Sequence, residues 1–418
     1  MPEFDRNLER EIAVKRIFTP GSPINQLDLF AGRLEQIEAI VGAIVSVGQH
    51  AIVYGERGVG KTSLAHILEA IFQRLGNKNE KFRFFVTNCD TDTEFSALWR
   101  RILREIELKV ALQEQDNTLD SNSEEKSPIL TLAHFLNEAQ INPDDIRILF
   151  DKQDFSTVII LDEIDRIERQ HTRRLLADTI KSLSDHASNV TIILIGVADA
   201  VETLIQEHES IERSLIQIHL PRMANGELSE ILDKRLSTLE LVMDDDAKQA
   251  IVMLSKGLPH YVHLLGQHAA LECLKSDRNR IISRDVEEAV DNAIRDTNRS
   301  VKSRYYSAIR SSRETLYEDV LLSCALSETN DLGYFTASEV KSHLSWLKEK
   351  PYEISAFARH LRDFSSKKRA NILERVGETR NYQYRFANPL MQPFAVMKGI
   401  QNQKIDLEVL TRVLGFDT

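Results

Sequence analysis

The stretch IVYGERGVGKTSL (residues 52–64) decides the fold, because it contains the pattern G-x-x-x-x-G-K-[ST]. The apolar segment HAIVYG precedes this pattern, and the helical segment KTSLAHILEAIFQRLG follows it. Glycines let backbone N–H groups curl around a phosphate, and the N-terminus of the following helix adds a positive dipole. We therefore predict a phosphate-binding loop, formed by Gly55, Glu56, Arg57, Gly58, Val59, Gly60, Lys61, Thr62 and Ser63.

Two residues of this loop have predicted roles in binding ATP. The Lys61 ammonium is expected to reach the β- and γ-phosphates, and the Thr62 hydroxyl is expected to bind Mg²⁺. The alternative is a chance glycine-rich turn, but the preceding strand and the following helix both argue against it. The predicted cofactors are therefore ATP and Mg²⁺.

A second motif, VIILDE (158–163), ends an apolar strand in two carboxylates. Asp162 is predicted to hold Mg²⁺, directly or through water, and Glu163 to orient and polarise the attacking water. The alternative is a strand that simply ends at the solvent with two acidic residues. The presence of the phosphate-binding loop favours the catalytic interpretation, which predicts an ATPase.

The first half of the chain alternates apolar strands with helices, which predicts an α/β P-loop NTPase fold around a five-stranded parallel sheet. The expected strands are HAIVYG, FRFFVTNCD (82–90), STVIILDEID, NVTIILIGVAD and LIQIHL (215–220). We assign residues 1–223 to this core, with a turn-containing lead-in over 1–30 and a flexible acidic insertion at about 112–128. The later segments are a helical domain over 224–297, a connecting helix over 298–312, and a third unit over 313–418 with strand-like segments RANILERVG and YQYRFAN.

The charge and hydropathy of the chain exclude several classes of protein. Its 418 residues carry 53 Lys and Arg against 64 Asp and Glu, so the net charge is 53 − 64 = −11. A chain that is acidic overall is no general nucleic-acid coat, so nucleic-acid contact has to come from a local basic patch. No apolar run is long enough to span a membrane, and the charged N-terminus lacks the apolar region of a secretory signal. We expect a cytoplasmic protein without membrane contact.

Two polar residues lie beside predicted strands, where they can approach a nucleotide. Asp199 ends ILIGVAD (193–199), near the expected γ-phosphate, but it also suits the N-cap of a following helix, and both interpretations stay open. Arg213 precedes the fifth strand, from where an arginine can reach the nucleotide of a neighbouring subunit. The alternative is a surface arginine paired with Glu209 or Glu212, and Arg222 is a second candidate for the same role.

The segment KGLPHYVHLLGQHAA (256–270) contains a Gly-x-Pro turn at the start of a helix. Such a turn can fold over the nucleotide, which places Pro259 and His260 among the candidate binding residues. His260 is a candidate phosphate-sensing cation. A single histidine on a helix is more often structural, so that alternative is kept.

These segments together resemble the AAA+ ATPases of the initiator clade, which includes origin-recognition and replication-licensing ATPases, with transposition-helper and STAND-type signalling ATPases nearby. The resemblance is carried by FAGRLEQI (30–37), GERGVGKTS, IILDEID, LIGVAD, ERSLIQIHLPRM and GLPHYVHLL, and it covers roughly residues 24–400. It implies that residues 224–297 form a helical lid and residues 313–418 a winged helix with a C-terminal tail. It also implies that Phe30, Gly32 and Arg33 lie near the adenine, and that Arg213 is the arginine finger that acts in the neighbouring subunit.

Two positions depart from the pattern of that clade. Asp199 stands where asparagine is usual, and His260 follows a Gly-x-Pro turn where the lid arginine is usual. The turn is closer to transposition-helper and STAND-type relatives. Both departures predict slow ATP turnover and leave ATP binding unaffected.

The C-terminal unit contains the predicted basic patch. Between residues 355 and 385 there are eight Lys and Arg against three acidic residues, a local charge of 8 − 3 = +5 in a chain of −11. An amphipathic helix, YEISAFARHLRDFSS (352–366), and a wing over 367–386 would contact double-stranded DNA or a protein partner. The candidate contact residues are Arg359, Arg362, Lys367, Lys368, Arg369 and Arg380. A solvated basic face is the alternative.

Two functions fit this sequence. The first is an ATP-dependent assembly factor that self-associates through its nucleotide site and closes on DNA or on a partner. The second is a STAND-type signalling or defence ATPase that controls a separate effector protein without direct DNA binding. An inactive scaffold is disfavoured by the intact Lys61, Thr62, Asp162 and Glu163.

Overall fold

The computed structural model describes most of the chain, namely residues 2–23, 26–75, 82–108, 130–135, 140–151, 153, 155–197, 209–311, 316–378 and 381–414. The chain divides into two compact units. The sheet unit comprises Glu35–Tyr54 and Ile71–His219, and the second unit comprises Met1–Leu34, Gly55–Ala70 and Leu220–Thr418. The predicted insertion at 112–128, Asp199 and Arg380 lie outside the described residues.

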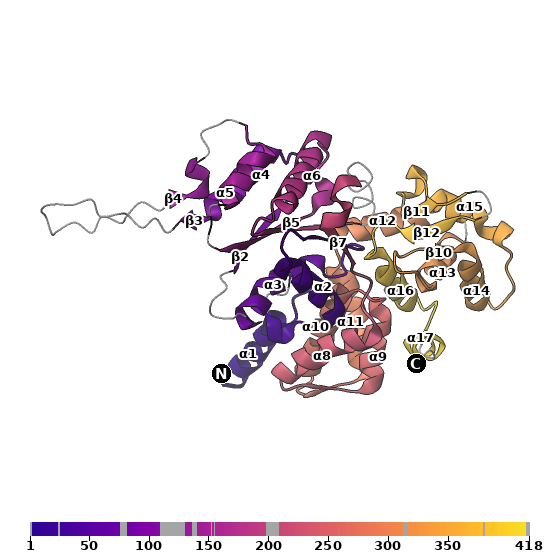
Figure 1. The fold of residues 1–418 in the computed structure, drawn as a ribbon. Helices are drawn as coiled ribbons and strands as arrows, with labels where there is room; N and C mark the ends of the chain where they lie inside the picture. Colours follow the sequence, from indigo (N-terminus) through magenta and orange to yellow (C-terminus); the bar gives the residue numbers. More distant parts are fainter. Residues whose placement is uncertain are drawn as a thin grey trace, which may run out of the picture. The chain divides into compact units, whose positions relative to one another are not determined.

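The sheet unit is built on five parallel strands in the order β2-β5-β6-β1-β7 (Figure 1). This confirms the predicted parallel sheet and each of its five strands. Their bounds are β1 (His50–Tyr54), β2 (Phe82–Asn88), β5 (Ser156–Asp162), β6 (Val190–Gly196) and β7 (Leu215–His219). The register pairs Tyr54 with Gly196 and Asn88 with Asp162, so the carboxyl ends of β1, β6, β5 and β2 meet at one edge of the sheet.

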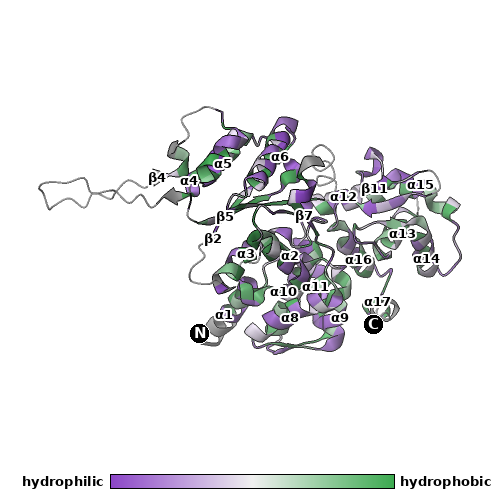
Figure 2. Cartoon of the chain, in the orientation of Figure 1, coloured by the Kyte–Doolittle hydropathy of each residue, from purple (hydrophilic) through white to green (hydrophobic). Residues whose placement is uncertain are grey.

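Helices and a hydrophobic core surround these strands. Nearly every residue of β5 and β6 is buried, because STVIILD and VTIILIG are apolar on both faces. Trp99 and Phe150 pack edge to face in the core, and α4 buries one apolar stripe. Figure 2 shows hydrophobic and hydrophilic residues on the same helices, as expected of amphipathic helices. The helices are α2 (Leu34–Val45), α4 (Phe95–Glu105), α5 (Pro143–Asp151), α6 (Gln170–Asp185) and the 3₁₀ helices η2 (Leu132–Phe135), η3 (Ile164–Arg166) and η4 (Glu209–Ser214).

The second unit contains the C-terminal domain and, before it in the chain, the helices that follow the parallel sheet. Its earlier elements are α1 (Pro2–Ile17), η1 (Leu27–Leu29), α8 (Asn225–Thr238), α9 (Asp245–Ser255), α10 (Pro259–Lys275), α11 (Ser283–Asp296) and α12 (Arg299–Ile309), with a short parallel pair, β8 (Val242–Met243) and β9 (Arg280–Ile281). The helices that the sequence predicts over 224–297 are present, and a helix lies at the predicted connection over 298–312.

The C-terminal domain has three helices before a pair of strands, and a three-stranded antiparallel sheet in the order β10-β12-β11. Its elements are α13 (Tyr317–Leu326), β10 (Phe335–Thr336), α14 (Ala337–Leu347), α15 (Ile354–Phe364), η5 (Lys367–Arg369), β11 (Leu373–Val376), β12 (Gln383–Phe386), α16 (Met391–Gln401) and α17 (Leu407–Leu414). A winged helix contains the same elements, namely three helices followed by two strands of a small antiparallel sheet.

Several elements were not predicted from the sequence. Residues 1–30 were interpreted as a turn-containing lead-in, whereas Pro2–Ile17 forms helix α1, which packs on α10. The two-residue strands β3 (Glu107–Leu108), β4 (Leu130–Thr131), β8, β9 and β10 were also missed, because a segment of two residues has no measurable periodicity. Within the described ranges, no helix combines the length and the hydrophobicity that a membrane span requires.

Candidate active site

The predicted phosphate-binding loop connects β1 to helix α3 (Lys61–Leu75). A Cβ atom on Gly55 would lie 2.2 Å from the carbonyl oxygen of Leu220, so only glycine fits there. Gly58 and Gly60 have φ values of +88° and +100°, which other residues rarely adopt. The loop is therefore a curled backbone that leads into a helix N-terminus, and it has the geometry that a bound phosphate requires.

Lys61 begins α3, and its ammonium donates hydrogen bonds to the carbonyl oxygens of Gly55 and Glu56, both at 2.8 Å. The side chain thus lies over the loop that it is predicted to serve. Thr62 and Ser63 follow in the first turn, half-buried. The residues of this loop fit an anionic ligand, because N–H groups, an ammonium and hydroxyls are all donors to phosphate oxygens.

We expect Gly55→Ala to destabilise the second unit, because its methyl group would overlap the backbone carbonyl of Leu220. Overpacking of this kind costs about 1–3 kcal/mol of unfolding free energy. Gly226→Ala is the matched control, since a Cβ on Gly226 has no atom within 4 Å and lies in helix α8. Urea denaturation followed by circular dichroism should show a lower midpoint for Gly55→Ala only. Equal midpoints for Gly55→Ala and the wild type would contradict this account of the loop.

The two carboxylates of VIILDE lie at the carboxyl end of β5, between β2 and β6. The Asp162 side chain is 3% exposed, and its Oδ1 accepts a hydrogen bond from the Glu163 backbone N–H at 2.7 Å. Glu163 has a left-handed backbone, with φ 58°, which is rare for this residue type. Its half-exposed carboxylate forms an ion pair with Arg166 at 2.9 Å. Asp162 is therefore held in place as the last residue of β5, whereas Glu163 follows the strand and its side chain is half-exposed to solvent.

Arg33 contacts the phosphate-binding loop through its side chain. Its guanidinium is buried and donates to the carbonyl oxygens of Val59 at 3.2 Å and Pro221 at 2.6 Å. Burial lowers the pKa of Arg33, partly offset by Glu227, whose carboxylate accepts the Arg33 backbone N–H at 2.8 Å. The carbonyl of the neighbouring Phe30 accepts a hydrogen bond from Lys234 at 2.5 Å. Residues 30–33 are thus held in place beside the loop, and the predicted contact of Phe30 and Arg33 with adenine stays a prediction.

His260 lies in the first turn of α10, directly after Pro259. Its Nδ1 is 2.7 Å from the carbonyl oxygen of Pro20, so this nitrogen carries the hydrogen of the bond. Burial lowers the pKa of His260, which favours the neutral ring. These contacts are those of a structural histidine, and phosphate sensing by His260 remains untested. Pro259 faces the loop, since a Cβ on Gly60 would lie 3.9 Å from its Cγ.

Arg213 ends η4, immediately before β7. Its side chain is 80% exposed, and its Nη2 lies 3.8 Å from a carboxylate oxygen of Asp185. The alternative pairing with Glu209 or Glu212 stays a prediction. An exposed arginine with one distant partner can reach another molecule. The position is consistent with the predicted role in a neighbouring subunit, which stays a prediction.

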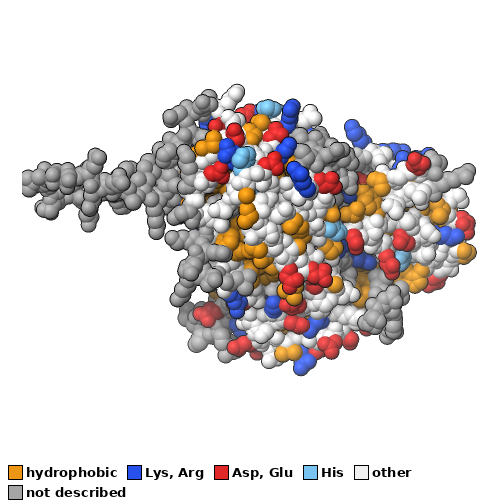
Figure 3. All heavy atoms as spheres, in the orientation of Figure 1, with side chains coloured by type: hydrophobic (Ala, Val, Ile, Leu, Met, Phe, Trp, Pro, Cys, Tyr) orange, Lys and Arg blue, Asp and Glu red, His pale blue; other side chains and the backbone are white. Residues whose placement is uncertain are grey.

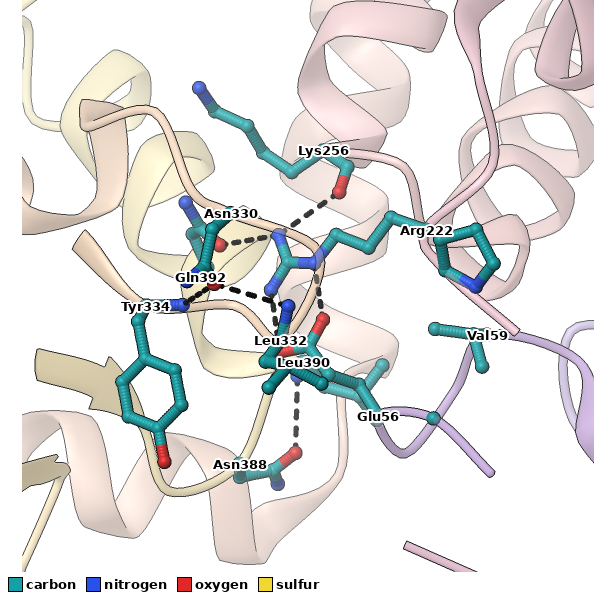
Figure 4. Close-up of polar contacts among 12 residues, drawn as sticks. Glu56, Val59, Arg222, Lys256, Asn330, Leu332, Tyr334, Asn388, Leu390 and Gln392 are labelled. Carbon is teal, nitrogen blue, oxygen red and sulfur yellow. Dashed lines mark hydrogen bonds and ion pairs between the residues drawn. The ribbon is translucent and has the colours of Figure 1, made fainter. Parts of the chain in front are cut away.

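Arg222, the second candidate for that role, is engaged within its own chain (Figure 4). Its Nη2 donates to Glu56 Oε1 at 3.1 Å, and its Nε donates to the other carboxylate oxygen. Its Nη1 donates to the Lys256 carbonyl at 3.1 Å and to Gln392 Oε1 at 2.6 Å. The guanidinium therefore joins the phosphate-binding loop to the C-terminal domain. The sequence gives no signal for this cluster, because Arg222 lies 166 residues from Glu56 and 170 residues from Gln392.

The basic residues of the C-terminal domain fall into two groups. Arg359, Arg362, Lys367 and Lys368 are exposed on α15 and η5, and we call these four the basic surface. Arg369 is turned toward the protein, since Nη1 donates to the Ala308 and Arg310 carbonyls and the guanidinium stacks on Tyr317 at 3.8 Å. Figure 3 shows Lys and Arg side chains along one edge of this domain.

Comparison with known proteins identifies the fold. The family model described as AAA domain matches residues 46–204. The solved structure of the ORC2 protein of Aeropyrum pernix (ADPNP-ADP complexes) has a TM-score of 0.50 at 14% identity and covers 93% of this chain and 98% of that chain. A Walker-type ATPase of Pyrococcus abyssi (TM-score 0.49, 16% identity, 91% and 99% covered) and the ORC1 protein of Aeropyrum pernix in complex with DNA (0.45, 15%, 93% and 96%) are also similar. No curated protein sequence matches the chain significantly.

These findings confirm the predicted resemblance. The family model places an AAA domain over the loop and both carboxylates, and the fold likeness to the ORC2 protein extends over nearly the whole chain. The predicted P-loop fold with its parallel sheet is thus correct.

Proposed function

We propose, from the AAA domain that residues 46–204 form, that this chain is a cytoplasmic ATPase that acts as a slow, ATP-set switch. ATP would bind with Mg²⁺ at the loop 55–63, and its binding would favour assembly of the chain on DNA or on a protein partner. The observation that carries this proposal is the conformation of the loop, in which Gly58 and Gly60 have positive φ and the Lys61 ammonium donates to the Gly55 and Glu56 carbonyls.

The roles of the residues follow from their chemistry. Lys61 would exchange its backbone carbonyl partners for phosphate oxygens, and Thr62 and Asp162 would hold Mg²⁺, whose charge favours phosphoryl transfer. Glu163 would orient the attacking water, for which it has to leave Arg166. The outward position of Glu163 supports a slow rate, because its catalytic geometry requires this rearrangement.

The exposed position of Arg213 supports self-association. An arginine finger contacts the nucleotide of another subunit and stabilises charge that develops in the transition state. Arg213 satisfies the requirement that such a side chain is exposed. We propose that the complete catalytic site forms between subunits.

DNA binding is proposed from the basic surface. Its four cations lie within ten residues of one another on a helix and the 3₁₀ turn after it, in a chain that is acidic overall. The structures of related fold include an ORC1 protein in complex with DNA, which makes DNA the first partner to test.

We expect double-stranded DNA to bind in the presence of ATP with an affinity that falls steeply as salt rises. The slope of log K against log salt is about −0.9 per neutralised phosphate, or about −3.6 for the four side chains of the basic surface. The double variant Lys367→Ala and Lys368→Ala should reduce that slope by about 1.8, as measured by fluorescence anisotropy.

The matched control is the double variant Lys341→Ala and Lys350→Ala, which removes two lysines from the same domain outside the basic surface. Its salt slope should equal that of the wild type. If both double variants lower the slope equally, the basic surface is not the binding site.

The second candidate is a STAND-type signalling ATPase that controls a separate effector. It is favoured by the contacts of the C-terminal domain with the phosphate-binding loop, where a Cβ on Gly58 would lie 3.3 Å from Leu390. An absence of DNA binding with ATP at low salt would favour this candidate over the first.

A further inference from the structure

We propose that the C-terminal domain pre-organises the phosphate-binding loop through a cluster of three side chains, Glu56, Arg222 and Gln392 (Figure 4). Arg222 and Gln392 would then be positioning residues for the nucleotide site. The proposal rests on the proposed function, since it requires that the loop binds a nucleotide. Its consequence is that nucleotide affinity depends on the contact of Arg222 with Gln392, which lies 170 residues after Arg222 in the chain.

The first step is the link between Arg222 and the loop. Glu56 accepts two hydrogen bonds from the Arg222 guanidinium through its two carboxylate oxygens. The side chains are 7% and 13% exposed, so solvent screens this ion pair little. The backbone carbonyl of the same Glu56 accepts a hydrogen bond from Lys61 at 2.8 Å. A shift of Glu56 therefore moves a direct partner of Lys61, the lysine proposed to bind phosphate.

The second step is the rigidity of the far end of the cluster. Gln392 is 1% exposed, and its Nε2 donates to the carbonyl oxygens of Ala325 and Ser327 at 3.1 and 3.4 Å. Because the amide nitrogen is used in this way, the amide oxygen is directed at Arg222, 2.6 Å away. Gln392 thus holds the guanidinium from the interior of the C-terminal domain.

Two backbone contacts reinforce the same link. A Cβ on Gly333 would lie 2.0 Å from Glu56 Oε1, so the turn at Gly333, with φ 78°, packs directly on the carboxylate. Leu390 lies against Gly58, and its carbonyl accepts a hydrogen bond from the buried Tyr261 hydroxyl at 2.7 Å. The loop is accordingly held by the C-terminal domain at both Glu56 and Gly58.

The third step is the effect on binding. A glycine-rich loop has many conformations, and ordering it when a ligand binds costs conformational entropy. If one conformation is fixed before the ligand binds, the binding free energy no longer includes this entropic cost. The cluster fixes Glu56 in the chain without a nucleotide. By linkage, a nucleotide that binds the fixed loop must strengthen the contacts of the C-terminal domain to the same extent.

The test is a double-mutant cycle on the affinity for a fluorescent ADP analogue with Mg²⁺, using the full chain. Gln392→Leu keeps the size of the side chain and removes its hydrogen bonds to Arg222. We expect it to weaken nucleotide binding about fivefold or more, within the usual range of coupled sites. In the Glu56→Gln background, where the ion pair is already lost, the same substitution should change the affinity much less.

The control is Tyr317→Phe, which removes the partly buried hydrogen bond from Tyr317 to Asp363 in the same domain without touching the cluster. It should leave nucleotide affinity unchanged. An unchanged or increased affinity in Gln392→Leu overturns the proposal, as does an equal loss in both backgrounds. If the wild type binds no nucleotide, the proposed function fails instead.

If the Gln392→Leu chain does not fold, a second measurement on the wild type tests the same proposal. In the wild type, hydrogen exchange of the backbone amides in 330–334 and 388–399 should slow when the nucleotide is added. Unchanged exchange in both segments, with the nucleotide bound, overturns the proposal.

Discussion

Glu163→Gln is expected to abolish ATP hydrolysis while ATP binding is retained. The substitution keeps the shape of the side chain but removes the charge that would polarise the attacking water. Losing a group of this kind typically lowers kcat by about 10²–10⁴-fold. Release of phosphate measures the rate, and the affinity for a fluorescent ATP analogue measures binding.

Glu168→Gln is the matched control, because Glu168 is an exposed glutamate of the same segment five residues later. It should hydrolyse ATP at the rate of the wild type. Equal turnover by Glu163→Gln and the wild type would remove Glu163 from its proposed role and leave the attacking water without an assigned partner.

Arg213→Ala is expected to lower kcat by about 10³-fold or more, as the loss of an arginine finger does. The physical reason is that a permanent, planar cation stabilises charge on the transferred phosphoryl group only while that charge develops. Binding of ATP to the isolated chain should stay unchanged, because an arginine finger acts on the nucleotide of the neighbouring subunit. Turnover and binding are measured as for Glu163.

Arg284→Ala provides a control of equal exposure, since the Arg284 side chain is 79% exposed against 80% for Arg213. It should have no effect on turnover. A strictly monomeric chain that hydrolyses ATP normally would exclude an arginine finger altogether.

The elements nearest the site could be predicted from the sequence because their signals are local. The phosphate-binding loop requires glycines at fixed spacing, and both Gly58 and Gly60 have the positive φ values that explain them. The strands β5 and β6 are apolar on both faces, which is typical of parallel strands buried on both sides. Asp162 is the last residue of β5 and Glu163 follows it, so predicting the strand also predicts the edge of the sheet at which the carboxylates lie.

Interactions between distant segments could not be predicted. Gln392 lies in the segment MQPFAVMKGI, which is typical of a buried helix, and nothing in it indicates a contact with Arg222. The sequence left a sensing and a structural role open for His260, and it does not indicate that Pro20, 240 residues earlier, accepts a hydrogen bond from this side chain. Arg369 counted as a member of a basic run, whereas the carbonyls of Ala308 and Arg310 bind it.

Helix α1 was not predicted for a different reason, because its own sequence pattern is too weak to indicate a helix. The segment PEFDRNLEREIAVKRI has few apolar residues, so its periodicity is poor and its charges suggested a lead-in. Its packing on α10 stabilises the helix, and Val14 and Phe18 at its end are buried. Tertiary contacts of this kind supply most of the stability of such helices.

Whether the catalytic site forms between subunits can be decided by one mixing experiment. Arg213→Ala and Glu163→Gln chains, each inactive alone, are combined in equal amounts with ATP, and a tag on one chain confirms that mixed assemblies form. Each mixed interface of one orientation then contains an intact Glu163 and an intact Arg213. We predict that ATP turnover returns to a substantial fraction of the wild-type rate. Mixed assemblies without any recovered turnover would contradict the claim.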